Sequence, residues 1–240
     1  DDTEQRADAA TTALRALRGD RPAVHIALYN QQSDVQLEGL RQRSLDIALV
    51  CEPPAFDDPD LQATQVLNDP MLLALPAGHP LANAEQITPD DLASQQWIGV
   101  MHKESALRHD TFIAACAKAG FTPSIAMEAS EPLAALGLVA AGLGLTTLQR
   151  SLDHQAPAGV VLRALPWFSY RTPLCSAWHR IHLRPLVETF RHTLLETATG
   201  QPPASAPRPP PLPLPPARPR GAPSPRPLHI GRASCVAMLS

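Results

Sequence analysis

The 240-residue sequence is poor in aromatic residues and in cysteine. Aromatic residues make up only 4% of the chain, so its core has to be mostly aliphatic. Its four cysteines, Cys51, Cys116, Cys175 and Cys235, are widely spaced and form no C-x-x-C pair. This spacing argues against a zinc site and a disulfide framework, and we expect free, buried thiols. No signal peptide and no apolar run of about 20 residues is present, which favours a soluble, cytoplasmic protein.

Sequence motifs of enzymes are also missing. The chain contains no G-x-S-x-G elbow, P-loop, H-E-x-x-H motif or dinucleotide fingerprint in a strand–turn–helix context. His79 lies between Gly78 and Pro80 in a turn, where a histidine more often caps the backbone than carries out chemistry. We therefore expect no catalytic residue, no metal ligand and no cofactor, and a protein that is not an enzyme.

The charged residues and the prolines are unevenly distributed. Five arginines are the only charged residues after residue 200, so residues 1–200 carry about −8 of a total formal charge of −3. With this negative charge, residues 1–200 are expected to bind nucleic acid poorly by themselves. Thirteen of the 27 prolines lie between residues 202 and 227. We expect residues 201–240 to form a disordered Pro-rich tail, with a ligand for a proline-recognition domain as the alternative.

Residues 128–148 carry the clearest structural pattern. Ser130 and Pro132 are typical of the N-cap and the first turn of a short helix. Gly142 stands where a helix commonly ends in a left-handed residue, and Gly144 allows a close approach of the backbone. The pattern predicts a helix, a tight glycine turn and a buried strand.

Hydrophobic periodicity predicts the other elements. We expect helices over residues 11–18, 33–41, 88–92, 110–117 and 183–197, and strands over residues 23–29, 45–50, 61–67, 71–75, 97–100, 124–127, 160–165 and 173–179. The order of strand, helix and strand over residues 23–50 predicts a parallel pair joined by a right-handed crossover.

Two stretches resemble a known family. Residues 116–128 and 138–144 resemble the effector-binding domain of LysR-type transcriptional regulators, whose pattern there is aGF.P...e......lVaaGlGi..lP. The run Pro-x-Val-x-Ile-x-Leu over residues 22–28, followed by Leu-Asp-Ile-Ala over residues 45–48, resembles the beginning of the same domain. One departure is Gln149, which stands where the family usually has proline.

The resemblance implies an α/β fold with two Rossmann-like subdomains joined by two crossing strands, similar to type 2 periplasmic binding proteins. The first subdomain then comprises residues 11–72 plus 174–197, and the second comprises residues 75–172. The family's first strand should precede Thr11. We expect both this strand and the family's winged helix-turn-helix domain to be missing from the given sequence.

In this family a small metabolite binds the cleft between the subdomains, which is lined by the starts of helices. Arg108 would meet a carboxylate, because its guanidinium fork matches one. The plain alternative is that the serines are N-caps and Arg108 is a solvated surface charge. The resemblance carries the effector-binding role onto Gln32, Ser33, Leu107, Arg108, Ser130 and Glu131.

The sequence therefore predicts the sensory domain of a LysR-type regulator that binds a small organic anion, such as an aromatic or aliphatic carboxylate. We expect a homo-oligomer, a dimer or tetramer, that contacts DNA only through a helix-turn-helix domain missing here and does not contact a membrane. The alternative is a free-standing periplasmic-type solute-binding protein, which shares the architecture. A hydrolase using serine or cysteine is a third hypothesis.

Overall fold

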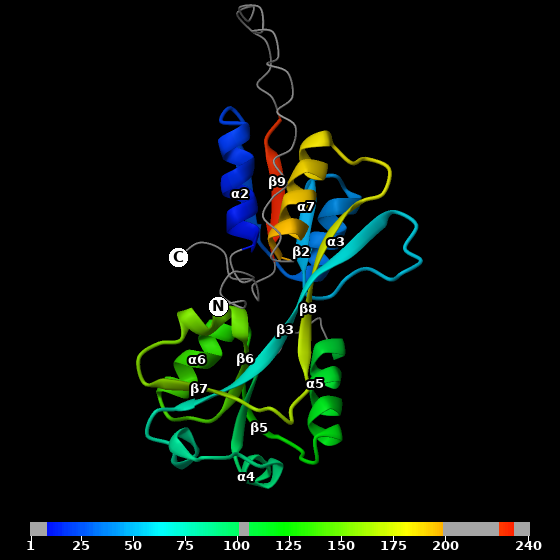
Figure 1. Cartoon of the computed structure of the whole chain (residues 1–240). Helices are drawn as coiled ribbons and strands as arrows, with labels where there is room; N and C mark the ends of the chain where they lie inside the picture. Colours follow the sequence, from blue (N-terminus) through cyan, green and yellow to red (C-terminus); the bar gives the residue numbers. More distant parts are fainter. Residues whose placement is uncertain (1–8, 101–105, 199–225, 233–240) are drawn as a thin grey trace, which may run out of the picture. The chain divides into compact units, whose positions relative to one another are not determined.

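A computed structural model describes residues 9–100, 106–198 and 226–232 (Figure 1). They divide into two compact units. Unit 1 contains the described residues up to 67 and from 174 onward, and unit 2 contains those between 68 and 173. Two long strands, β3 (Leu61–Pro76) and β8 (Arg171–His179), each run from one unit into the other. No helix in the described part of the chain is long and apolar enough to cross a membrane.

Unit 1 is a sheet with helices packed on it. Its strands follow the order β1-β9-β2-β8, and β3 lies next to β8. Strand β2 is antiparallel to β8, and helices α2 and α7 pack against each other. Besides β3 and β8, the unit contains α2 (Ala9–Asp20), β1 (Ile26–Asn30), α3 (Ser33–Arg41), β2 (Ile47–Val50), α7 (Pro185–Ala198) and β9 (Leu228–Arg232).

Strand β9 corrects two of the sequence-based expectations. Residues 228–232 belong to the predicted disordered tail, yet they form a strand parallel to both β1 and β2. We also expected β1 and β2 to be a hydrogen-bonded pair, whereas β9 lies between them. The two strands are parallel as expected, but each is hydrogen-bonded to β9 and not to the other.

The residues of β9 fit this central position closely. Leu228 and Ile230 are fully buried. A Cβ atom on Gly231 would lie 2.5 Å from Oε1 of Gln36 and 2.7 Å from a methyl group of Leu45, so a side chain there would have to displace the ends of these two side chains. A short apolar strand with glycine at position 231 therefore fits the space between β1 and β2.

Polar contacts fix the start of β9. The carboxylate of Asp46 accepts hydrogen bonds from the backbone N–H of His229, at 2.8 Å, and from the guanidinium of Arg184, at 3.1 Å. The same guanidinium donates to the carbonyl of Pro227 at 3.2 Å. Because Asp46 precedes β2 and Arg184 precedes α7, this cluster joins β9 to two other elements of unit 1.

Unit 2 combines a parallel pair of strands with an antiparallel group. Strand β4 is parallel to β5, while β6 and β7 are antiparallel to β3. Its elements, apart from parts of β3 and β8, are η1 (Pro80–Asn83), α4 (Pro89–Ala93), β4 (Gln96–Val100), α5 (Ala106–Lys118), β5 (Ser124–Ala129), α6 (Pro132–Ala140), β6 (Thr146–Gln149), η2 (Arg150–Gln155) and β7 (Val160–Ala164).

The few aromatic residues of the chain are concentrated in unit 2. Trp97 stacks on Phe121 with ring centroids 5.7 Å apart, and Phe112 lies 5.9 Å from Tyr170. Six of the ten aromatic residues take part in this group. Aromatic contacts of this kind add to the free energy gained from burying the rings. Three of the six, Trp97, Phe121 and Phe168, belong to a buried cluster whose other members are mostly aliphatic, so the mostly aliphatic core expected from the sequence is confirmed.

Several local patterns form as the sequence predicts. Thr88 caps α4 in a capping box with Asp91. His79 caps η1, where its Nδ1 accepts a hydrogen bond from the N–H of Leu81 at 3.2 Å. Gly142 adopts a positive φ of 78° after α6. A Cβ atom on Gly144 would lie 2.9 Å from the carbonyl oxygen of Gln96, which confirms the expected close approach.

The cysteines follow the sequence-based expectation only in part. Cys116 and Cys175 are free and buried, and burial raises the pKa of the Cys116 thiol to about 12. Cys51, however, is disulfide-bonded, so the expectation of four free thiols is wrong. Spacing along the sequence failed here because a disulfide needs proximity in the fold only. Cys235 lies outside the described residues.

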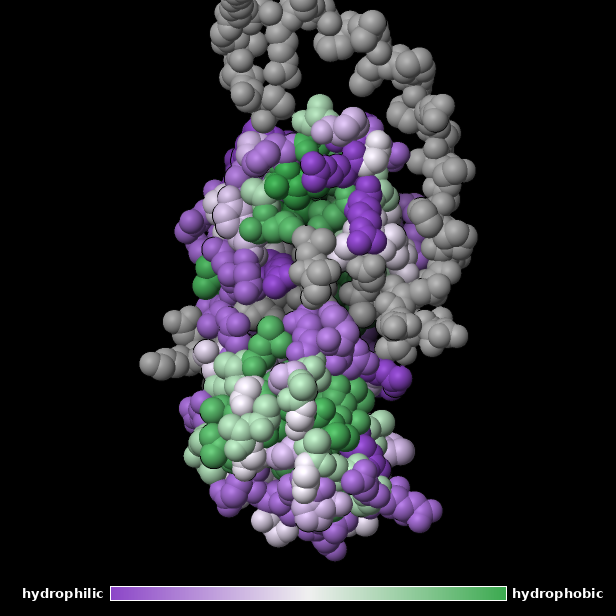
Figure 2. Space-filling model, turned by 90° about the vertical axis from the view of Figure 1, so that its left-hand side faces the viewer, coloured by the Kyte–Doolittle hydropathy of each residue, from purple (hydrophilic) through white to green (hydrophobic). Residues whose placement is uncertain are grey.

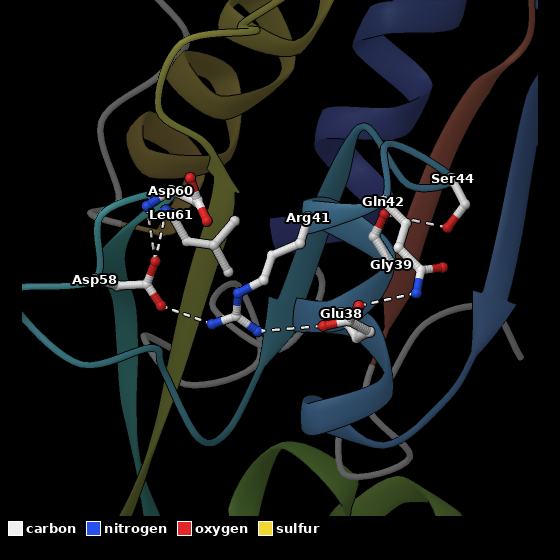
Figure 3. A network of polar contacts seen from close by, with 8 residues as sticks. All are labelled: Glu38, Gly39, Arg41, Gln42, Ser44, Asp58, Asp60 and Leu61. Carbon is white, nitrogen blue, oxygen red and sulfur yellow. Dashed lines mark hydrogen bonds and ion pairs between the residues drawn. The ribbon is translucent and has the colours of Figure 1, made fainter.

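A polar network joins α3 to the start of β3 (Figure 3). One carboxylate oxygen of Asp58 accepts hydrogen bonds from the N–H groups of Asp60, at 3.0 Å, and Leu61, at 2.9 Å. The other accepts one from the guanidinium of Arg41 at 2.7 Å. Burial opposes the charged form of Asp58, but the N–H of Leu61 and the guanidinium of Arg41 outweigh it, so the pKa of this carboxyl is lowered.

We predict that Gly231→Val destabilises unit 1 by about 1–3 kcal/mol, because the added side chain meets Gln36 and Leu45. Hydrogen–deuterium exchange should show faster exchange of the β1 and β2 amides, with unit 2 unchanged. Gly19→Val is the matched control, since a Cβ atom on Gly19 meets nothing within 4 Å. Unchanged protection of β1 and β2 in the Gly231 variant would contradict the central position of β9.

We also predict that Asp58→Asn lowers the free energy of unfolding by about 1–2 kcal/mol at pH 7 through its weakened hydrogen bonds. Because the folded pKa of Asp58 is lowered from 3.8, its carboxylate stabilises the fold above that value and loses this effect as the pH falls through the folded pKa. Urea titrations at pH 7 and pH 3 should therefore show the difference from wild type shrinking in acid. The exposed neighbour, Asp57→Asn, should behave like wild type at both pH values.

Candidate functional site

The predicted site residues of unit 1 lie at the start of α3. Gln32 is the N-cap of this helix and makes no side-chain capping bond. Ser33 was expected to be the cap, but it is the first helical residue because Gln32 already has extended backbone angles, with φ −69° and ψ 158°. The Ser33 hydroxyl instead accepts a hydrogen bond from the N–H of Cys51 at 3.2 Å, which joins α3 to the end of β2.

The other predicted residues lie at two helix starts in unit 2. Leu107 and Arg108 are in the first turn of α5, and their side chains lie outside the described part. Ser130 and Glu131 precede α6 and are both exposed. The N-cap of α6 is Glu131, with φ −144° and ψ 152°, so the expectation that Ser130 caps this helix is wrong.

A small cavity in unit 2 joins these two helix starts. Its volume is about 40 Å³. His109, which follows Arg108, and Pro132, which follows Glu131, both line it. Strand β6 contributes further lining residues that the sequence did not predict as site residues. The complete lining consists of Met71, Ile98, Gly99, Val100, His109, Phe112, Ile125, Pro132, Thr146, Thr147, Gln149 and Tyr170.

The polar groups of the cavity lie in an apolar wall. Thr146 donates a hydrogen bond from its hydroxyl to the carbonyl of Ile98 at 2.8 Å, so this donor is already used. Gln149, at the end of β6, is 2% exposed. None of the described lining residues is aspartate, glutamate, lysine or arginine. The cavity can therefore bind a small group through hydrogen bonds, and its lining carries no pair of carboxylates for acid–base chemistry.

A buried carboxyl group fixes the chain directly after Gln149. Both oxygens of Asp69 accept the N–H of Ser151, at 3.3 and 3.2 Å, where β6 passes into η2. Asp69 is 6% exposed, and its burial raises the pKa of this carboxyl above its ordinary value. This contact holds the end of β6, and with it Gln149, in a fixed position.

A wider hollow of about 1000 Å³ lies on unit 1. It is lined by residues 53–59, the first residues of β3, Trp178 and Arg191. The guanidinium of Arg191 lies 4.6 Å from the centroid of the Trp178 ring and also bonds to Glu188 at 3.1 Å. Arg180, which also lines the hollow, donates to the carbonyl of Asp58 at 3.0 Å, so both cations are engaged within the fold. None of the predicted site residues lines this hollow.

The described residues contain no group of three or more histidine, cysteine, aspartate or glutamate side chains that could hold a metal ion. This finding covers the described part of the chain only.

Curated proteins similar to this chain are transcriptional regulators. The chain is 31% identical to the HTH-type regulator AlsR of Bacillus subtilis over 179 residues, which cover 75% of this chain and 59% of AlsR. It is 26% identical over 163 residues to the transcriptional dual regulator GltC of the same organism, which covers 68% of this chain and 51% of GltC. The chain thus spans about half to three fifths of the length of these relatives.

Solved structures with the same fold are effector-binding domains. One is the BenM effector-binding domain with its effector benzoate, which has a TM-score of 0.65 and 22% identity and covers 78% of this chain and 83% of that domain. Another is the effector-binding domain of QuiR in complex with shikimate, which has a TM-score of 0.66 and 16% identity over 78% of this chain and 89% of that domain. The type 2 periplasmic-binding-protein-like fold expected from the sequence is confirmed.

The model of one family, the LysR substrate binding domain, matches residues 7–199. Strand β9 lies beyond these residues. The family consists of transcriptional regulators and not of enzymes, in agreement with the absence of catalytic motifs from the sequence. The chain therefore belongs to the LysR substrate-binding domain family.

Proposed function

We propose that this chain is the sensory part of a cytoplasmic LysR-type transcriptional regulator and binds a small organic anion. The cavity of unit 2 is the single observation that carries this proposal, because two helix starts and the end of β6 meet there. Helix starts favour anions, since their first N–H groups lack partners within the helix and the positive end of the dipole lies there. The cavity has room for the anionic group at the end of such a metabolite, and its apolar wall suits the carbon atoms next to that group.

The proposed ligand is a carboxylate. Benzoate and shikimate, which are bound by the domains of BenM and QuiR, are both carboxylates. Arg108 is proposed to pair with the carboxylate of the effector, because it lies in the first turn of α5, the helix start that meets the cavity, and its guanidinium matches a carboxylate. The remaining proposed contacts are Gln32, Ser33, Leu107, Ser130 and Glu131.

The homo-oligomer expected from the family resemblance is also part of the proposal. Helix α6 is apolar along most of its length, and Leu133 and Leu143, at and just beyond it, are 48% and 46% exposed. Figure 2 shows apolar side chains gathered over part of the surface of unit 2. A second copy of the chain that covers this surface would remove it from water. Contact with DNA is proposed to come from a helix-turn-helix domain of the regulator.

We predict that benzoate, shikimate or another small carboxylate raises the melting temperature of the full 240-residue chain in a thermal-shift assay. At about 100 times the dissociation constant, the ligand should add roughly 2.7 kcal/mol of stability. Isothermal titration calorimetry should show Arg108→Ala binding at least about tenfold more weakly, as expected for loss of a charged hydrogen bond. Ser33→Ala should weaken binding less.

Lys118→Ala is the matched control, because Lys118 is an exposed cation in the last turn of the same helix, α5. It should bind the carboxylate as wild type does. A cooperative melt that no carboxylate shifts would refute the sensory role while leaving the fold intact.

A further inference from the structure

Gln149 is an unusual residue for its position. It is the last residue of β6, where its backbone is paired with Met71 of β3 and its side chain is 2% exposed. Glutamine is mostly found on protein surfaces, and a buried amide normally has hydrogen-bond partners. Among the described residues, however, no atom accepts a hydrogen bond from Nε2 of Gln149.

A buried amide without a partner lowers stability, so its presence needs an explanation. The cavity that Gln149 lines offers one. Its volume of about 40 Å³ exceeds the roughly 10–15 Å³ that a cavity needs to hold one water molecule, so it has room for a small polar group. A carboxylate or hydroxyl group at the end of a larger ligand fits this description.

The other walls of the cavity combine apolar side chains with the polar groups of His109, Thr146, Thr147 and Tyr170. Met71, Ile98 and Phe112 are apolar. The hydroxyl of Thr146 already donates to the carbonyl of Ile98. The amide of Gln149 is thus a buried donor without an acceptor, at a point that the Asp69–Ser151 contact holds fixed.

We infer that Nε2 of Gln149 donates a hydrogen bond to a carboxylate oxygen of the effector and thereby selects ligands that carry an acceptor there. This inference rests on the proposed function, because it assigns a contact within the same site. The family pattern has proline at this position, and proline has no side-chain donor. Gln149 therefore gives this chain a ligand preference that members with proline cannot share.

The chemistry favours a charged acceptor. A hydrogen bond to a carboxylate is stronger than one to a neutral oxygen, and a buried donor discriminates against ligands that leave it unpaired. A carboxylate side chain at position 149 would weaken binding, because it would repel an anionic ligand.

Calorimetric titration of the full chain with benzoate, shikimate and acetate tests this inference. Gln149→Leu, which keeps the volume but removes the donor, should bind the carboxylate at least about tenfold more weakly than wild type. Its melting temperature without ligand should be equal or higher, because an unpaired amide has been removed. Gln149→Glu should show no measurable binding. Gln155→Leu, which alters a glutamine of η2 that does not line the cavity, should bind as wild type does.

A second measurement separates a ligand contact from a contact with water alone. The side-chain amide signal of Gln149 in a ¹⁵N-correlated NMR spectrum should shift as the carboxylate saturates the protein. An unchanged signal, or equal affinity of Gln149→Leu and wild type, overturns the inference and leaves the proposed function standing. Failure of wild type to bind any of the three carboxylates refutes the proposed function, and the inference falls with it.

Discussion

The hydrogen bonds that β9 forms with β1 and β2 are the constraint on which unit 1 depends. Without a strand between them, both neighbours would leave a row of N–H and C=O groups unpaired inside the sheet, which is costly where water cannot reach. Helix α3 connects β1 to β2, and its start carries Gln32 and Ser33. The position of these two residues therefore depends on five residues that lie outside the part of the chain matched by the family model.

Unit 2 obtains its stability in a different way. Its group of six aromatic rings joins β4, α5 and the segment after β7, and the cavity lies directly against that group, since Phe112 and Tyr170 belong to both. A rigid wall of this kind keeps polar groups such as Thr146 and Gln149 at fixed positions. Fixed donors bind a ligand with a smaller loss of conformational entropy than mobile ones.

Local chemistry made much of the fold predictable from the sequence. The capping box at Thr88 and the glycine turn at Gly142 depend on residues close in sequence, and both form as expected. Strand β9 could not be found in this way, because its five residues follow a proline-rich stretch and pair with residues 26–30, about two hundred positions away. The helix starts were displaced by one residue at Ser33 and Ser130, since backbone angles and not side-chain type decide the cap. The unusual residue at 149 was visible in the sequence, but its burial and unpaired amide were not.

The place of β9 in the sheet also sets an order of events during synthesis. The described residues of unit 2 all lie between 68 and 173, so this part can fold while later residues are still being added. Unit 1 cannot close its sheet until residues 228–232 have left the ribosome, and contacts between such distant residues form slowly. During that interval β1 and β2 present open edges that can pair with other chains. Rapid completion of the chain therefore shortens the time during which the unfinished sheet can aggregate.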